Sequence, residues 1–153
     1  MERLSLACFV SSHGFGHASR SASLLQKIAR RVPELHVLVF GETPAWFWQA
    51  NLPESCTWRL VRAKTDVGLV QKGPFEHDLA KTLCELRRFI PVSSATLDSL
   101  SQVLLEAKPD LIISDISPLG IALGSHLGIF TCLVENFTWD WIYRGYESQY
   151  PEF

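Results

Sequence analysis

Short apolar runs alternate with helix-type patterns along the whole chain. The first run, Leu4 to Val10, is rich in β-compatible residues and ends at a polar stretch that contains glycine. From His17 onward, apolar residues recur every three or four positions, which marks one face of an amphipathic helix that Pro33 closes. Four later runs also have the length and composition of strands. They are Leu35 to Phe40, Thr57 to Val61, Leu111 to Ser114 and Phe130 to Val134.

Helical patterns lie between these runs, and one long segment shows neither period. The helical segments are Pro44 to Asn51, Leu79 to Ile90, Leu97 to Leu104 and Pro118 to Leu127. Pro91 breaks or kinks the chain between the second and the third of them. A further helix is expected within Asn136 to Tyr146. Residues 62–76 contain two glycines and one proline. We expect a loop there, of the functional or mobile kind.

Strands that alternate with helices predict an α/β fold with a doubly wound, Rossmann-like parallel sheet covered on both faces. Residues 111–113, which are apolar at successive positions, suit a strand that is buried on both faces. The usual strand order, 3-2-1-4-5, makes the first and fourth strands neighbours. Ligands bind such sheets at the carboxyl ends of the strands, so we expect the site there. Residues 1–153 are expected to form a single domain.

Composition narrows the class of protein further. The chain has 153 residues, 47% of them hydrophobic and 20% charged, with a formal net charge of −2. These values are typical of a globular domain and exclude a disordered chain. The charge balance gives no general attraction to nucleic acid or to an anionic membrane, and no apolar run approaches the roughly 20 residues of a membrane span. Four cysteines without a CxxC pair predict reduced thiols in a cytoplasmic protein.

Three polar clusters follow predicted strands and are therefore expected at one edge of the sheet. The first is Ser12-His13-Gly14-Phe15-Gly16-His17, the second is Asp115, and the third is Glu135-Asn136. Glycines between a strand and a helix let the backbone turn tightly and approach a ligand, and helix N–H groups favour an anion such as a diphosphate. A structural turn does not require the two histidines that frame these glycines, so a functional site is the favoured interpretation.

A dinucleotide-binding fingerprint is the main alternative for this turn. Gly14 and Gly16 match its first two glycines, and Glu42 stands where the ribose-binding acid is expected. Ser19, however, occupies the position of the third glycine, and a dehydrogenase has no need for an imidazole at His17. We therefore expect no nicotinamide or flavin cofactor.

His17 and Asp115 make chemical sense as a general-base pair. An imidazole titrates near neutral pH, and a carboxylate on its other nitrogen fixes the tautomer and stabilises the imidazolium. Such a base can deprotonate a sugar hydroxyl for attack on an electrophilic carbon. The structural alternative is that Asp115 caps the helix beginning near Pro118, and both roles are compatible. A hydrolytic Ser-His-Asp triad is disfavoured because the chain has no G-x-S-x-G sequence.

The remaining histidines and the last two tryptophans are less informative. His36, His77 and His126 are isolated in the sequence, so no metal site is expected. Trp139 and Trp141 follow the last predicted strand, at the expected edge of the site. An aromatic face there suits stacking on a sugar or an acyl chain, and equally suits simple packing.

The ordered motifs resemble a known family. A glycine-rich turn that ends in Gly-His after the first strand resembles the N-terminal domain of GT-B glycosyltransferases, including MurG-like peptidoglycan transferases. The longer sequence HGFGHASR, with DVGLVQ at 66–71, SDISP at 114–118 and NFTWDWIY at 136–143, resembles a narrower group. That group contains predicted bacterial glycosyltransferases and the glycosyltransferase-like N-terminal region of plant L-arabinokinase. The likeness covers nearly the whole chain.

This resemblance implies the N-terminal, acceptor-side half of an inverting, metal-independent enzyme that transfers a sugar from a nucleotide-sugar donor to a hydroxyl acceptor. His17 falls at the position of the base and Asp115 at that of its carboxylate partner, while Gly14 and Gly16 face the donor diphosphate. The other expected ligand contacts are Ser12, His13, Arg20, Glu135, Asn136 and Trp139. Many relatives have proline where this chain has Arg20.

The length of the chain departs from the family pattern. No C-terminal nucleotide-sugar domain follows the fifth predicted strand. We therefore expect a half-enzyme that is inactive alone and needs a complementary domain or chain. We also expect apolar surface at the carboxyl edge and around Trp139 and Trp141, which the other domain would cover, to cause self-association or poor solubility. The alternative function is a non-catalytic, regulatory module that binds a nucleotide sugar or a sugar phosphate.

Overall fold

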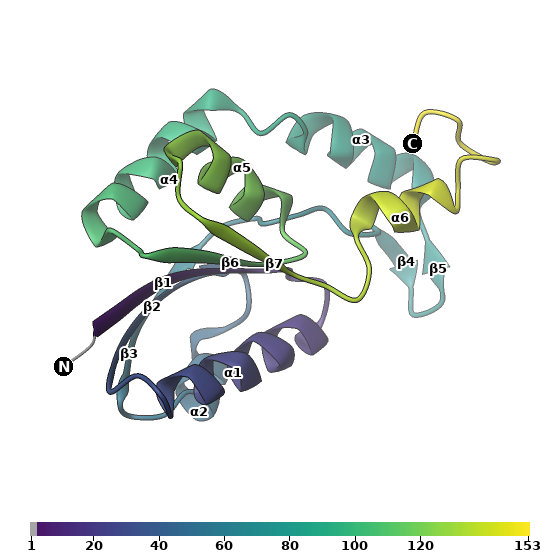
Figure 1. The fold of residues 1–153 in the computed structure, drawn as a ribbon. Helices are drawn as coiled ribbons and strands as arrows, with labels where there is room; N and C mark the ends of the chain where they lie inside the picture. Colours follow the sequence, from purple (N-terminus) through teal and green to yellow (C-terminus); the bar gives the residue numbers. More distant parts are fainter. Residues whose placement is uncertain (1–2) are drawn as a thin grey trace.

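A five-stranded parallel sheet forms the centre of the computed structural model, which describes residues 3–153 (Figure 1). The strands are β1 (Arg3–Val10), β2 (Glu34–Gly41), β3 (Cys56–Arg62), β6 (Leu111–Asp115) and β7 (Thr131–Val134). Their spatial order is β3-β2-β1-β6-β7, which confirms the predicted order because β6 and β7 are the fourth and fifth predicted strands. Met1 and Glu2 of the predicted domain lie outside the described residues.

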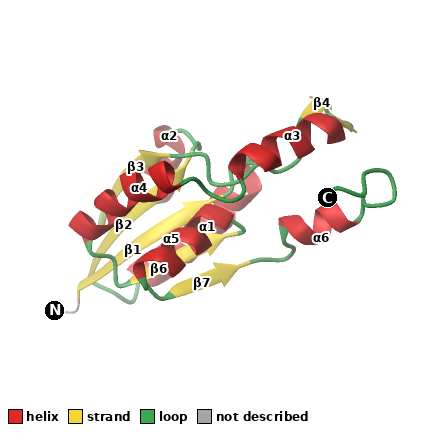
Figure 2. Cartoon of the chain, turned by 90° about the horizontal axis from the view of Figure 1, so that it is seen from above, coloured by secondary structure: helices red, strands yellow, loops and turns green. Residues whose placement is uncertain are grey.

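Helices cover both faces of the sheet, as the prediction requires. In Figure 1, α1 (Phe15–Ala29) and α2 (Ala45–Asn51) lie below the sheet, and α4 (Ser94–Ala107) and α5 (Pro118–Leu127) lie above it. Two more helices, α3 (Leu79–Phe89) and α6 (Trp139–Arg144), lie beyond the carboxyl ends of the strands (Figure 2). These two helices surround the edge at which the site is expected.

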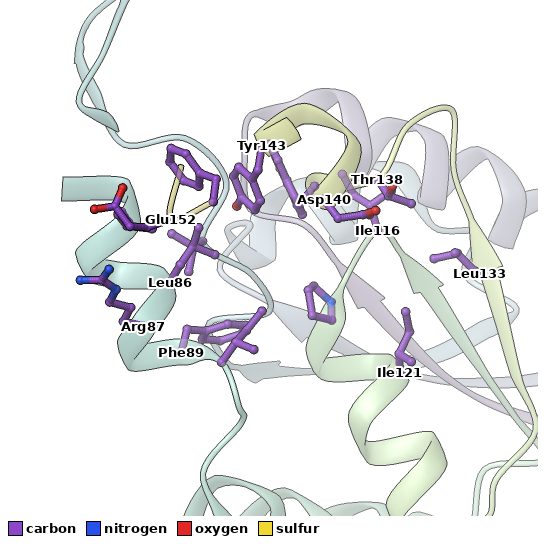
Figure 3. A pocket seen from close by; sticks show the side chains of 16 residues that line it. Leu86, Arg87, Phe89, Ile116, Ile121, Leu133, Thr138, Asp140, Tyr143 and Glu152 are labelled. Atoms are coloured by element: carbon purple, nitrogen blue, oxygen red, sulfur yellow. The ribbon is translucent and has the colours of Figure 1, made fainter. Parts of the chain in front are cut away.

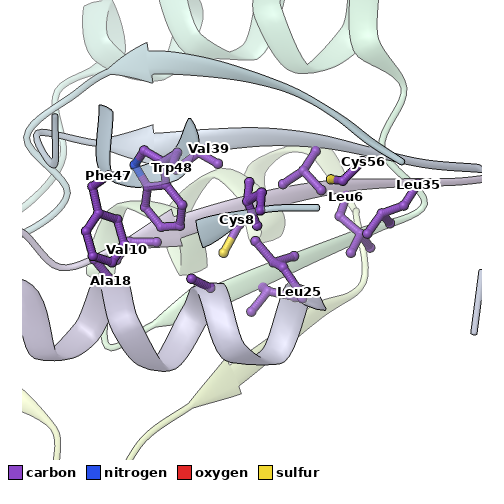
Figure 4. Close-up of a cluster of buried hydrophobic side chains, with 14 residues drawn as sticks. Leu6, Cys8, Val10, Ala18, Leu25, Leu35, Val39, Phe47, Trp48 and Cys56 are labelled. Atoms are coloured by element: carbon purple, nitrogen blue, oxygen red, sulfur yellow. The ribbon is translucent and has the colours of Figure 1, made fainter. Parts of the chain in front are cut away.

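Alternate side chains of β1 contribute to two separate cores. The first core lies between the sheet and the helices α1 and α2, and it contains Leu6, Cys8 and Val10 of β1 (Figure 4). The fully buried Leu25 and Trp48 belong to the same core. The intervening residues of β1 belong to a second core on the opposite face, which includes buried residues of α4 and α5. Because side chains alternate along a strand, a run that is apolar at every position can fill both cores.

Several boundaries differ from the sequence prediction. α1 begins at Phe15 rather than at His17. The helix expected within Asn136 to Tyr146 is present as α6, Trp139–Arg144. The segment 62–76 is not a plain loop, since it contains a hairpin formed by β4 (Gln71–Gly73) and β5 (Glu76–His77). Strands this short do not contain enough residues to show a period of two in the sequence.

The four cysteines occupy two kinds of environment. Cys8 and Cys56 are buried, whereas Cys84 and Cys132 are exposed, and all four are free thiols. Cys132 lies on the edge strand β7, where it and the next residue, Leu133, are both exposed. Across residues 3–153, no helix has both the length and the apolar character needed to cross a membrane.

Candidate active site

The carboxyl edge of the sheet brings the three predicted polar clusters together. Val10 at the end of β1 is in register with Asp115 on β6, and Asp115 is in register with Val134 on β7. The turn that follows β1 leads directly into α1, so the first turns of α1 lie beside the end of β6. Parallel neighbouring strands thereby join residues that are 98 positions apart in the sequence.

His17 and Asp115 form a hydrogen-bonded pair at this edge. His17 Nδ1 lies 2.8 Å from Asp115 Oδ1. An ionised carboxylate can only accept, so Nδ1 carries the proton and Nε2 is the nitrogen left to accept one from a ligand. The side chain of His17 is 12% exposed and that of Asp115 is fully buried. The contact expected from the strand order is therefore present, and it has the geometry of a base oriented by a carboxylate.

Asp115 has two further partners on α1. Arg20 donates to both carboxylate oxygens, with Nε 3.1 Å from Oδ2, and Ser21 Oγ donates to Oδ2 at 2.8 Å. Burial alone would raise the pKa of Asp115, but hydrogen bonds from His17, Arg20 and Ser21 outweigh burial and hold this pKa below its ordinary value. Asp115 is therefore ionised at neutral pH.

The capping interpretation of Asp115 is wrong. Ser117 is the N-cap of α5, and its Oγ accepts the N–H of Gly120 at 3.2 Å. The same hydroxyl donates to the carbonyl oxygen of Thr65 at 3.0 Å. Asp115 lies two residues earlier, at the end of β6, and both of its oxygens accept from side chains of α1.

Arg20 joins α1 to the ends of two strands. Beyond its contacts with Asp115, Nη1 donates to Asn136 Oδ1 at 2.8 Å, and Nη2 donates to the carbonyl oxygen of Val134 at 3.5 Å. Most of the five guanidinium N–H groups are thus used within the protein. Arg20 therefore positions Asp115 and Asn136, while its contact with a ligand stays a prediction.

The glycine turn leaves the start of α1 open. Gly14 has a φ of 83°, which glycine adopts without strain, and its N–H donates to the carbonyl oxygen of Ser12 at 2.9 Å. Ser12 Oγ in turn accepts the N–H of Glu42 at 3.1 Å. Within the described part of the chain no side chain caps α1, and a Cβ at Gly16 would meet no atom within 4 Å. The predicted ligand contacts of Ser12, Gly14 and Gly16 remain predictions.

Asp66 is a site residue that sequence reasoning missed. Its Oδ2 accepts the indole N–H of Trp139 at 2.8 Å, and this indole meets the His13 ring edge-on with ring centres 5.3 Å apart. Burial raises the pKa of Asp66 despite hydrogen bonds from Ser11 and Trp139. Burial also lowers the pKa of His13, although the charge of Asp66 opposes that change. The signals in the sequence were the motif DVGLVQ, which begins with Asp66, and the aperiodic segment 62–76 that contains it.

Residues 65–70 form a wall that several hydrogen bonds fix in place. Thr65 Oγ1 donates to the carbonyl oxygen of Val10 at 2.8 Å, and Tyr143 Oη donates to that of Gly68 at 2.9 Å. Gly68 has a φ of 61°, and a Cβ at this position would lie 2.6 Å from Nδ1 of His13. The absence of a side chain at Gly68 therefore lets the wall pack directly on the His13 ring.

Two hollows that share Thr138 lie beside these residues. The first is a largely apolar cavity of about 400 Å³ between α3, α5 and α6, and Ile116 and Trp139 form part of its lining (Figure 3). None of His13, His17 and Asp115 lines this cavity. The second hollow, of about 420 Å³, is lined by Glu135, Asn136, Phe137, Thr138 and Trp141.

Comparisons with known proteins agree with the fold and the motifs. No protein-family model matches the chain. L-arabinokinase from Arabidopsis thaliana is 26% identical over 149 residues, which are 95% of this chain and 14% of that protein. A UGT transferase from Siraitia grosvenorii in complex with UDP matches with a TM-score of 0.55 and 14% identity, over 87% of this chain and 28% of that one. UGT2 from Phytolacca americana, complexed with UDP-2-fluoroglucose and pterostilbene, matches with a TM-score of 0.52 and 18% identity, over 87% of this chain and 30% of that one.

These matches define the class of fold. The chain has the α/β fold found in GT-B UDP-glycosyltransferases, and its sequence is similar to part of L-arabinokinase, so the resemblance expected from the motifs is confirmed at that level. The chain spans less than a third of the length of each of these proteins.

Proposed function

We propose that this chain is the acceptor-side domain of a glycosyltransferase that moves a sugar from a nucleotide-sugar donor to a hydroxyl group. The observation that carries the proposal is the His17–Asp115 pair, with 2.8 Å between Nδ1 and Oδ1. Its setting supports the proposal, because the fold is shared with glycosyltransferases that were solved with UDP and with UDP-2-fluoroglucose.

In the proposed reaction, Nε2 of His17 removes the proton of the acceptor hydroxyl while the acceptor oxygen bonds to the anomeric carbon of the donor sugar. The bond between that carbon and the diphosphate breaks in the same step, and the nucleoside diphosphate leaves with the electron pair. This single displacement inverts the anomeric centre and is metal-independent. The ionised Asp115 stabilises the imidazolium that forms.

The donor diphosphate is proposed to approach the start of α1. The uncapped first turn of α1 and the open space at Gly16 support this placement, because helix N–H groups and the helix dipole favour an anion. Most donor contacts are assigned to a complementary nucleotide-sugar domain or chain, so residues 1–153 alone are expected to transfer sugar poorly. A cytoplasmic location, predicted from the cysteine pattern, is part of the same proposal.

Replacing His17 tests the proposed base in the chain joined to a nucleotide-sugar domain. His17→Ala is expected to lower turnover by about 10²–10⁴ and to leave the KM for the donor nearly unchanged. Asp115→Asn is expected to cost less, because Asp115 orients the imidazole without taking the proton. The measurement is nucleoside diphosphate release from a set of nucleotide sugars. His126→Ala is the matched control, since His126 is an exposed histidine on α5.

Two outcomes would contradict parts of this proposal. If His17→Ala raises KM and leaves turnover intact, His17 is a binding residue and His13 becomes the next candidate for the base. If the joined protein binds a nucleotide sugar but shows no turnover with any hydroxyl acceptor, the alternative of a non-catalytic, regulatory module is correct.

A further inference from the structure

We infer that the hollow lined by Glu135, Asn136, Phe137, Thr138 and Trp141 binds a saccharide ring, which makes the hydroxyl acceptor a sugar or a glycoside. The assignment of this ring as the acceptor rests on the proposed function. The binding of the ring itself rests only on the composition and the position of the hollow.

Trp141 supplies an exposed aromatic face to the hollow. Its side chain is 65% exposed, whereas Trp139, two positions earlier on α6, is 7% exposed and packs inward. Binding surfaces commonly contain a large, solvent-exposed aromatic side chain. Burying such a side chain under a ligand releases ordered water, which favours binding. One face of a pyranose ring consists of C–H groups, and an indole presents a complementary face of negative potential to them.

Glu135 and Asn136 supply the polar groups that hydroxyls need. No donor within residues 3–153 forms a hydrogen bond or an ion pair with the Glu135 carboxylate, so it can accept from two hydroxyl groups. Arg20 occupies Oδ1 of Asn136 at 2.8 Å, which fixes the amide and leaves its NH₂ group to donate. An acceptor and a donor beside an aromatic face match the vicinal hydroxyls and the apolar face of a sugar.

The position of the hollow connects it to the proposed base. The contacts of His17 include Asp115, Arg20 and the ring of Phe137, whose centre lies 6.0 Å from that of the imidazole. Phe137 lines the hollow, and Arg20 holds Asn136 in it. The apolar cavity, in contrast, includes none of these five residues in its lining. A ring in the hollow therefore lies on the His17 side of the site.

The size of the hollow fits a small ligand. Its volume of about 420 Å³ lies within the range of about 300–1,000 Å³ that is usual for small-molecule sites. A sugar ring could reach it either as a free glycoside or as the sugar of a nucleotide donor. The two sources share the same chemistry, so the experiment must separate them.

Titration of residues 1–153 with methyl glycosides of glucose, galactose, mannose and xylose tests the inference. The readout is the set of backbone amide and indole N–H resonances. The indole signals report separately on the five tryptophans, and the backbone amides of residues 135–138 report binding in the variant that lacks Trp141. At least one glycoside is expected to shift the Trp141 resonance with a Kd of about 1–10 mM, as suits a single ring in an open site. Trp141→Ala and Glu135→Ala are expected to weaken this binding about tenfold or more.

Trp46→Ala is the matched control, because Trp46 is 62% exposed on α2 and contributes nothing to the hollow. This variant is expected to bind the glycoside with the affinity of the parent chain. The inference is overturned if no glycoside binds up to about 100 mM, if Trp46→Ala weakens binding as much as Trp141→Ala does, or if cyclohexanol shifts the Trp141 resonance as strongly as a glycoside.

UDP-glucose and UDP separate the two sources of the sugar. If UDP-glucose binds and its binding depends on Trp141, while no methyl glycoside binds, the hollow holds the donor sugar. That result would overturn the assignment of the hollow to the acceptor. Failure of the proposed function would give a different result. In that case a glycoside would still bind at Trp141, but His17→Ala would leave the turnover rate of the joined protein unchanged. The two failures are therefore distinguishable.

Discussion

Asp115 is the residue on which the geometry of the proposed site depends most. It is fully buried, yet its two oxygens accept hydrogen bonds from His17, Arg20 and Ser21, all of which lie on α1. A buried charge is tolerated only when it is paired and hydrogen-bonded, and here one set of contacts also fixes the tautomer of the imidazole. The same carboxylate thus stabilises the packing of α1 on β6 and orients the proposed base.

The two buried carboxylates predict opposite effects of pH on stability. The lowered pKa of Asp115 means that its contribution to folding is present above its ordinary pKa of 3.8 and is lost as pH falls through the lower, folded value. The raised pKa of Asp66 means that its contribution to folding is present below its ordinary pKa of 3.8, where the carboxyl group is protonated. This contribution is lost as pH rises through the higher, folded value. Asp115→Asn should therefore destabilise the protein most near neutral pH, whereas Asp66→Asn should gain stability relative to the parent as pH rises above 4.

Urea unfolding at several pH values between 3 and 8 measures both variants. Asp66→Asn keeps an oxygen that can accept the indole N–H of Trp139, so only the charge is removed. Asp98→Asn on α4, where the residue is exposed, is the control and should follow the parent at every pH. The prediction is contradicted if Asp66→Asn and Asp115→Asn lose the same amount of unfolding free energy at every pH. The two carboxylates would then not have opposite effects on the pH dependence of stability.

Gly16 is expected to matter for ligand binding rather than for folding. A Cβ at this position meets no atom within 4 Å, and its backbone has no positive φ, so Gly16→Val should change the free energy of unfolding by less than about 1 kcal/mol. The β-branched side chain would nevertheless occupy the space through which a diphosphate approaches α1. Calorimetric titration with UDP of the chain joined to a nucleotide-sugar domain should show binding weakened about tenfold or more.

Gly14→Ala provides the contrasting variant, because the φ of 83° at Gly14 strains any residue with a side chain. It should lower stability as well as binding. If Gly16→Val binds UDP as the parent chain does, the turn is not the diphosphate site.

The pairing of His17 with Asp115 could be predicted from the sequence, whereas the role of Arg20 could not. Strand order follows from the alternation of strands and helices, and it places the ends of β1 and β6 together without any knowledge of side chains. The direction of a long side chain depends on rotamers and on local packing, so the sequence did not show that Arg20 would turn to Asp115 and Asn136. Asp66 was missed for a related reason, since it lies in a segment with no period.

The segment 65–70, which follows β3, behaves as a structural element although it is neither helix nor strand. Its backbone is held by Thr65 at one end, by Tyr143 in the middle and by Thr82, whose Oγ1 accepts the N–H of Val70 at 2.9 Å. The sequence indicated a functional or mobile loop here, because irregular backbone shows no periodicity whether or not it is fixed. Side-chain hydrogen bonds that connect the segment to β1, α6 and α3 are what fix it.

Gly68→Ala is expected to disturb this element and His13 together. The new Cβ would lie 2.6 Å from His13 Nδ1, and the φ of 61° disfavours alanine, so a loss of about 1–3 kcal/mol in the free energy of unfolding is expected. Gly73→Ala is the matched control in β4, because a Cβ there meets no atom within 4 Å and φ is not positive. Urea unfolding and the NMR signals of the His13 ring measure the two effects. Unchanged stability and unchanged His13 signals in Gly68→Ala would contradict this account of the wall.

In the assembled sheet, the interior strand β1 is fully buried along most of its length, whereas the edge strand β7 is not. β1 has neighbours on both sides and helices on both faces, while β7 has β6 on one side only. The sequence pattern of β7 is as apolar as that of the inner strands, so the sequence predicted a strand correctly but gave no sign that its side chains remain exposed. That property depends on which elements cover the strand and can be seen only in the assembled fold.

The exposed apolar surface around β7 is expected to make residues 1–153 self-associate. Phe130 is 77% exposed, Leu133 is 40% exposed and Ile121 is 45% exposed. Ile121 lines one hollow with Phe130 and another with Leu133, so the three side chains form a continuous surface. Burying a phenylalanine contributes about 1.5–3 kcal/mol, so Phe130→Ser should weaken association about tenfold or more.

Sedimentation velocity over a range of concentrations, in a reducing buffer, measures this self-association. The reducing agent prevents a disulfide through the exposed Cys132 from mimicking a non-covalent dimer. Leu105→Ser is the matched control, because Leu105 is 59% exposed on α4 and lines neither the hollow that contains Phe130 nor the one that contains Leu133. The control should associate as the parent chain does, since the free edge of β7 and its apolar neighbours are unchanged. A parent chain that stays monomeric up to about 100 µM would contradict the prediction, because any association would then have a Kd well above that concentration.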